Sequence, residues 1–301
     1  MMQEKNTRSA LLSLIASMVI FGTIGIFRRH IPLPSSMIAM MRGLIGMAFL
    51  LLVLQAKRQK LDGKAIRENA AMLLLSGALL GFNWILLFEA YRYTSVATAT
   101  LCYYMAPILV MLLSPVLLGE RLTAKKALCV LAALAGMVLV SGVLQAGFAG
   151  GREVTGVLFG LGAAALYAGV ILTNKRIHDI SAYDKTIVQL GTSAALLLPY
   201  TLLTEKTAGM AITGGALVML LLVGVVHTGV AYWLYFGCMG SLRAQTVALL
   251  SYIDPVVAIV LSALLLGERM TLGGALGAVL VLGATITSEL PEKAIKKGNE
   301  P

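Results

Sequence analysis

Apolar runs, each close to the roughly 20 residues that a helix needs to cross a bilayer, follow one another along most of the chain. Inside a membrane, water cannot bond to backbone N–H and C=O groups, so a run of this length must be helical there. The runs cover residues 10–27, 34–54, 70–90, 94–117, 124–144, 156–173, 184–203, 214–237, 242–266 and 272–289. We therefore expect an all-α integral membrane protein with ten transmembrane helices.

Composition and charge fit this class. Hydrophobic residues make up 58% of the chain and charged residues 13%, whereas soluble domains carry about 25% charged residues. The net charge of +10 alone would allow a nucleic-acid partner, but most Lys and Arg residues fall in alternate loops, on one side of the predicted bundle. The positive-inside rule makes this side, with both termini, the cytoplasmic side of the inner membrane. We expect membrane lipids around the chain and no nucleic acid bound to it.

The second half of the chain repeats the pattern of the first half. YMAPILVMLLSPVLLGERLT begins at Tyr104, and YIDPVVAIVLSALLLGERMT begins 148 residues later, at Tyr252. The predicted units are residues 1–148 and 149–301, the second with a short cytoplasmic tail. Each holds five spans, an odd number, so the two units must insert in opposite orientations. Inverted repeats of this kind are typical of secondary transporters, whose substrate site lies near the membrane midplane between the repeats.

These features resemble the drug/metabolite transporter superfamily, EamA type. The stretches YTSVATATLCYYMAPILVMLLSPVLLGERLT and GSLRAQTVALLSYIDPVVAIVLSALLLGERMT carry the resemblance, together with the ten spans in two halves. The resemblance implies a secondary transporter that moves a small metabolite, such as an amino acid, amine or nucleobase, across the cytoplasmic membrane by alternating access. It implies export or exchange, and it leaves proton coupling open.

Charged residues inside the spans are the first candidates for a substrate site. Arg42 and Asp254 lie within predicted spans, and Glu89 lies near the end of one. Because an isolated charge at this depth costs about 2.5–3.5 kcal/mol on insertion scales, each calls for a functional hypothesis. We expect Arg42 and Asp254 to face a central cavity, with Asp254 and Glu89 as candidates for proton coupling. The alternatives are a structural ion pair, or an Arg42 side chain that reaches the membrane surface.

Two prolines, Pro107 and Pro255, lie at equivalent positions inside predicted spans. A proline removes one backbone donor and leaves a carbonyl one turn earlier unpaired, so each helix should kink. Such carbonyls are tolerated at membrane depth where they line a cavity. The hydroxyl-bearing residues just before the kinks are therefore predicted to line the substrate cavity: Tyr103, Tyr104, Ser251 and Tyr252. The alternative is that both prolines only shape helix packing.

A second polar and aromatic set lies on the third and eighth spans, which are repeat partners. Asn83, Trp84, Thr228 and Tyr232 are predicted to line opposite walls of the cavity. His227 titrates near neutral pH and is a candidate proton relay. A hydrogen bond between helices is the alternative for His227, and a place in the aromatic belt at the membrane surface is the alternative for Tyr232.

The two Gly-Glu-Arg corners lie at the membrane edges, far from the midplane. They are predicted to end one helix and begin the next, with Glu120, Arg121 and their repeat partners Glu268 and Arg269 available for capping or for pairing within the loops. Thr123 and Thr271 are the corresponding N-cap candidates.

Other classes of function fit the residues less well. A membrane-embedded enzyme would need a nucleophile with a base, or clustered carboxylates or histidines around a metal. The three histidines lie far apart, and the cysteines Cys102, Cys129 and Cys238 lie in apolar runs without CxxC spacing. We therefore expect no enzymatic activity, no metal and no cofactor. A membrane sensor that transports nothing is the other alternative. One chain supplies both halves, so a monomer suffices, and a dimer is left open.

Overall fold

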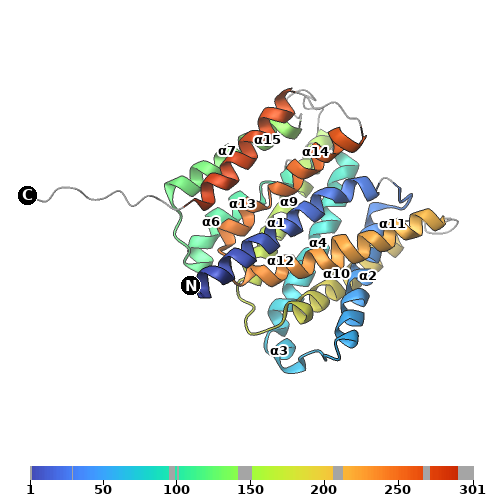
Figure 1. Ribbon diagram of the computed structural model, residues 1–301. Coiled ribbons are helices and arrows are strands. Elements are labelled where there is room, and N and C mark those ends of the chain that lie inside the picture. The colour runs from blue at the N-terminus through green and yellow to red at the C-terminus, as the bar shows by residue number, and fades with distance from the viewer. Residues whose placement is uncertain are drawn as a thin grey trace, which may run out of the picture.

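The computed structural model describes residues 2–28, 30–94, 99, 102–141, 151–205, 213–266 and 272–290, and the regular structure in these ranges is helical. Figure 1 shows the helices packed against one another in a single bundle.

The helices follow the predicted spans closely. In the first half they are α1 (Met2–Arg28), α2 (Ser35–Ala56), α4 (Ala70–Tyr93), α6 (Ala106–Leu118) and α7 (Ala124–Ser141). In the second half they are α9 (Gly151–Asn174), α10 (Ala182–Thr204), α11 (Gly214–Gly224), η1 (Val225–Val230), α12 (Ala231–Met239), α13 (Ala244–Leu250), α14 (Ile253–Leu266) and α15 (Leu272–Glu289). The short helix α3 (Gly63–Glu68) was not predicted; the Asp62 side chain caps it by accepting from two backbone N–H groups.

Length and hydropathy identify membrane-spanning segments among these helices. Within the described ranges, six stretches are long and apolar enough to cross a membrane: Thr7–Ile24, Ser35–Ala56, Ala70–Tyr93, Glu153–Asn174, Ala182–Thr204 and Gly214–Met239. Three shorter apolar helices cover Ala106–Leu118, Ala244–Ala258 and Leu272–Ser288. Large apolar side chains such as Val116 and Leu203 are exposed on the outside of the bundle, as expected where lipid is the solvent. The fold is an all-α integral membrane fold, and the count of ten spans stays a prediction.

Helix packing keeps the same pattern when the two halves are exchanged. Helix α4 packs on α9, and their repeat partners α12 and α1 also pack together. Likewise α10 contacts α4 while α2 contacts η1, and α6 contacts α9 while α14 contacts α1. The pairs α7 with α15 and α2 with α10 join equivalent helices, and Figure 1 shows α7 and α15 side by side at one edge of the bundle. A two-fold axis between the halves produces such a pattern. The predicted boundary at residue 148 lies outside the described residues.

The fourth and ninth spans are interrupted just before Pro107 and Pro255. In the first half, Tyr104 and Met105 form a turn and α6 begins at the next residue, with Pro107 in its first turn. In the second half, Ser251 and Tyr252 form a turn between α13 and α14, and Pro255 follows in the first turn of α14. A proline in a first turn removes no helical hydrogen bond, because the first N–H groups of a helix have no intrahelical acceptor.

The eighth span contains a π-helical segment, η1, which the sequence did not predict. Thr228 donates its hydroxyl to the carbonyl of Val223, five residues earlier, at 3.1 Å. Gly46 of α2 lies so close to η1 that a Cβ atom there would be 3.0 Å from the backbone N of Gly229. π-Helical turns often mark functional sites, and this one faces the helix that carries Arg42.

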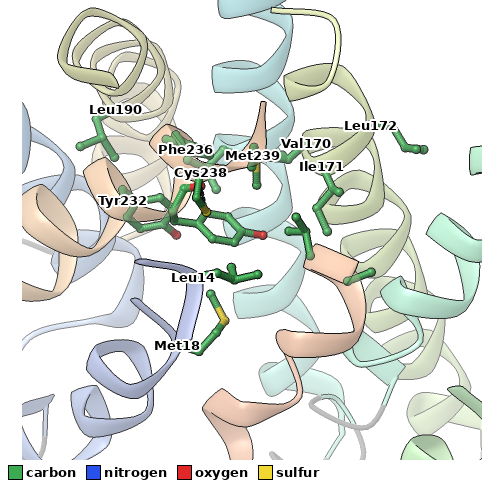
Figure 2. Packing of buried hydrophobic residues seen from close by; sticks show 14 of the residues in the cluster. Leu14, Met18, Val170, Ile171, Leu172, Leu190, Tyr232, Phe236, Cys238 and Met239 are labelled. Carbon is green, nitrogen blue, oxygen red and sulfur yellow. Dashed lines mark hydrogen bonds between the residues drawn. The ribbon is translucent and has the colours of Figure 1, made fainter. Parts of the chain in front are cut away.

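The largest buried cluster lies where α1, α9, α10 and α12 meet. Figure 2 shows Leu14 and Met18 of α1 close to Tyr232 and Phe236 of α12, with Val170 and Ile171 of α9 on the other side. This packing joins helices from both halves.

Close helix contact depends on glycine in α4. A Cβ atom on Gly77 would lie 2.6 Å from Thr192 Cβ and 2.8 Å from the Gln189 carbonyl oxygen of α10. We expect Gly77→Ala to destabilise the fold by about 1–3 kcal/mol, because α10 must move away. Thermal unfolding in detergent will show this as a lower midpoint.

Gly283 of α15 is the matched control, since a Cβ atom there meets nothing within 4 Å. Gly283→Ala should leave the midpoint unchanged or slightly higher, because alanine favours helix more than glycine. Equal midpoints for the two variants would contradict this account of the α4–α10 contact.

Candidate functional site

Arg42 and Asp254 lie inside the bundle and act on each other electrostatically. Arg42 lies in α2, and Asp254 is the second residue of α14, directly after the break. Both are half-buried. They are not within ion-pair distance of each other; the ion pairs found in the described part of the chain are Lys64–Glu68 and Arg92–Glu89.

An aromatic neighbour holds the Arg42 side chain. The guanidinium carbon lies 4.5 Å from the centre of the Trp84 ring, within cation–π range. The Tyr232 hydroxyl lies within reach of both Trp84 and Arg42. The Nε atom of Arg42 is buried and has no hydrogen-bond partner among the described residues. The contact with the Trp84 ring therefore orients the guanidinium group, and the Nε–H of Arg42 remains available to another acceptor.

Tyrosine rings from four spans form a continuous chain of contacts. Tyr252 packs against Tyr104 (centroids 6.0 Å apart), Tyr104 against Tyr103 (5.8 Å) and Tyr103 against Tyr167 (5.3 Å). The Tyr167 and Tyr235 hydroxyls are 2.6 Å apart, and Tyr235 reaches Tyr232 at 6.2 Å. The charge of Asp254 acts on Tyr103, Tyr104, Tyr167 and Tyr232. Asp254 therefore lies near an arc of phenol groups from both halves.

Sequence reasoning left Tyr167 and Tyr235 out of the candidate site. Tyr167 is half-buried and joins the arc from α9. Its signal in the sequence is weak: a single aromatic residue in the small-residue stretch AAALYAG.

Several predicted site residues bond to the backbone instead. Asn83 donates its Nδ2 to the Ala163 carbonyl at 2.6 Å, which ties α4 to α9. Ser251 donates to the Val247 carbonyl at 2.8 Å, within the end of α13. Together with Thr228, both side chains are buried. Their hydrogen bonds serve helix geometry and helix contact.

His227 joins two helices. Its Nε2 lies 2.7 Å from the Thr23 hydroxyl of α1, and that hydroxyl lies 2.7 Å from the Ile20 carbonyl. Either group can be the donor of the bond between His227 Nε2 and the Thr23 hydroxyl, because the tautomer of the imidazole sets the role of each ring nitrogen. The Nδ1 atom is buried without a partner among the described residues. The Phe27 ring lies 4.8 Å from the imidazole.

Glu89 belongs to a cluster at the end of α4. Arg92 donates to its carboxylate at 3.0 Å, and the Tyr200 hydroxyl of α10 donates to the same oxygen. The Glu89 side chain is 18% exposed. This cluster joins the ends of α4 and α10.

The first Gly-Glu-Arg corner connects the two halves. Gly119 ends α6 in the left-handed region (φ 66°), which glycine adopts without strain. The Glu120 carboxylate accepts from the backbone N–H groups of Ala244 at 2.8 Å and Gln245 at 3.3 Å, at the start of α13. The Gln245 side chain donates to the Ser114 hydroxyl at 2.9 Å. Thr123 accepts from Lys126 N–H as the N-cap of α7. Glu268 and Thr271, in the second corner, lie outside the described residues.

Comparisons with known proteins point to a transporter family. The model of the EamA-like transporter family matches this chain twice, over residues 8–142 and 154–288. A Bacillus subtilis (strain 168) protein named uncharacterized transporter YxxF is 31% identical over 278 residues, 92% of this chain and 88% of the relative. Protein RarD of Salmonella typhi is 26% identical over 274 residues, 89% of this chain and 90% of the relative. A solved crystal structure, 21% identical, has a TM-score of 0.82 over 94% of this chain and 96% of that one, which shows a shared fold.

The Glu120 cap should contribute measurably to stability. We expect Glu120→Ala to lower the free energy of unfolding by about 0.5–2 kcal/mol, because two backbone donors of α13 lose their acceptor. Glu120→Gln keeps one acceptor oxygen and should lose less. The thermal midpoint in detergent measures both. Glu68→Ala is the control, since that exposed side chain makes only a 3.9 Å ion pair; a midpoint as low as that of Glu120→Ala would contradict the capping role.

Proposed function

The chain belongs to the EamA-like transporter family, and on this premise we propose that it is a secondary transporter that moves a small metabolite across the cytoplasmic membrane by alternating access. It is a multi-pass membrane protein. The proposed cargo is an amino acid, an amine, a nucleobase or a similar molecule, and the proposed mode is export or exchange. Both termini lie in the cytoplasm in this proposal, since the basic loops share their side.

The observation that carries the proposal is the pair of unbridged charges, Arg42 and Asp254, inside the bundle. An isolated charge in a membrane costs about 2.5–3.5 kcal/mol on insertion scales, and a direct ion pair would reduce this cost. The two groups instead stay apart and half-buried. Two half-buried charges that do not pair with each other support the proposal of a space between the helices, which water or a substrate fills.

The proposed cavity keeps part of the predicted set. Arg42, Trp84, Tyr103, Tyr232 and Asp254 are its members, because their rings and charges meet between the halves. We add Tyr167 from α9. Asn83, Thr228 and Ser251 shape the surrounding helices, since their donors already have backbone acceptors.

Proton coupling is assigned to Asp254 in this proposal. It follows a helix break directly, and among the described residues Arg42 is the charged neighbour that acts on it. His227 and Glu89 are weaker candidates, because each already bonds to a neighbouring helix. The proposal includes no enzymatic step and no cofactor, and a monomer suffices for it.

A substrate panel in proteoliposomes tests the function. Amino acids, nucleobases and amines are offered with and without a pH gradient, and uphill accumulation is expected for one of these classes. Asp254→Asn should abolish accumulation driven by the pH gradient, because the carboxyl that exchanges the proton is gone. Counterflow between equal pools should persist, because the amide keeps the shape of the site.

Two results would contradict parts of the proposal. No flux of any compound, with protein shown to be folded, would remove the transporter assignment. Full accumulation by Asp254→Asn, or loss of counterflow along with accumulation, would remove the coupling role. Glu68→Gln is the matched control, since that carboxylate is exposed on α3.

A further inference from the structure

Tyr104 and Tyr252 are equivalent residues of the two repeats, and they touch each other. They are 148 residues apart, which is the offset of the repeat. Their ring centres are 6.0 Å apart. Equivalent residues of a two-fold arrangement can meet only near the axis, so this contact lies close to the axis that relates the two halves.

The break in the fourth span makes a backbone acceptor available there. The Ile108 N–H donates to the Met105 carbonyl at 3.0 Å, not to Tyr104 one residue further back. The Tyr104 carbonyl instead accepts the Tyr252 hydroxyl at 2.8 Å. Tyr252 is 0% exposed, so no water competes for this bond.

The bond runs in one direction. In the part of the chain that the structure describes, Tyr252 donates to the Tyr104 carbonyl, and the reverse bond is not found. Tyr104 is half-buried, and its ring packs edge-on against Tyr103. Two residues that are equivalent in sequence are therefore in different environments.

Alternating access explains why two equivalent residues make an asymmetric contact. In an inverted-repeat transporter the site opens to one side and then the other as one repeat moves against its partner. If the halves exchange their conformations, every contact near the two-fold axis is replaced by the equivalent contact with the roles of the two halves exchanged. For the present bond, the equivalent contact is a hydrogen bond from the Tyr104 hydroxyl to the Tyr252 carbonyl.

We propose that Tyr104 and Tyr252 form a reciprocal latch: one hydroxyl holds the state described here, and the other holds the state that opens to the opposite side. This inference rests on the proposed transport by alternating access. It assigns to the pair a part in the conformational step, in place of the substrate contact predicted from the sequence.

The latch makes an unusual prediction for two identical substitutions. Tyr252→Phe removes the donor of the present state, and Tyr104→Phe removes the donor of the opposite state. Each keeps its ring and therefore its packing. One buried neutral hydrogen bond changes a two-state equilibrium about fivefold, so the variants should shift it about fivefold in opposite directions. The double variant should return near the parent value, because both states then lose one bond.

A cysteine reporter reads the equilibrium without substrate. Ala248 of α13 is 0% exposed in this state, so Ala248→Cys, in a chain with Cys102, Cys129 and Cys238 replaced by alanine, is protected here from a water-soluble maleimide, and its alkylation rate reports departures from this state. Tyr252→Phe should raise the alkylation rate about fivefold, and Tyr104→Phe should lower it about fivefold. Thermal midpoints confirm that each variant is folded.

The outcomes separate the latch from a merely structural bond. If Tyr252→Phe raises the rate while Tyr104→Phe has no effect, and the double variant matches Tyr252→Phe, the bond only stabilises this state and the latch is wrong. Equal rates in all variants would also overturn it. Because the reporter needs no substrate, a failed flux panel with opposite rate shifts would count against the transport proposal and not against a two-state latch.

Discussion

Two helices of this bundle stop and restart inside the membrane, and the backbone groups that they release must find partners without water. For the break in the fourth span, the partner comes from the other half of the chain: the Tyr252 hydroxyl bonds to the Tyr104 carbonyl. The start of α13, at the edge of the bundle, is likewise capped from the first half by Glu120. Backbone groups in both halves are therefore satisfied across the interface between the halves. Main-chain hydrogen bonding thus couples the local geometry of one half to the position of the other.

The helices were largely predictable, because their cause is local. Apolar runs near 20 residues have few alternatives in a bilayer, and the observed helices begin and end within a few residues of most of the predicted runs. The breaks were only partly predictable. Proline predicts where helical bonding fails, but the sequence does not show that the Tyr104 carbonyl, released before the restart at Ala106, bonds to Tyr252 of the other half. The π-helical segment had no sequence signal, since it depends on tertiary contacts such as that of Gly46.

The residues of the candidate site also differ in how far the sequence could predict them. Arg42 and Asp254 could be found from the sequence because a charge in an apolar run is costly wherever it points. Neutral polar residues give no such signal: the backbone acceptors of Asn83 and Ser251 lie on positions that the sequence pattern does not indicate. Tyr167 could not be selected for the opposite reason. One tyrosine among small residues becomes informative only when Tyr103 and Tyr235 are placed beside it.

The position of Asp254 links the breaks to the charges. It is the second residue of α14 and lies two residues after the Ser251–Tyr252 turn, so its carboxyl follows any movement of the helix start at Ile253. Arg42, by contrast, lies within a continuous helix and is held over the Trp84 ring. A change at the break therefore moves one charge relative to a fixed opposite charge. Because Coulomb energy in a poorly solvated interior varies steeply with separation, a change in the charge of the Asp254 side chain and the geometry of the break must influence each other.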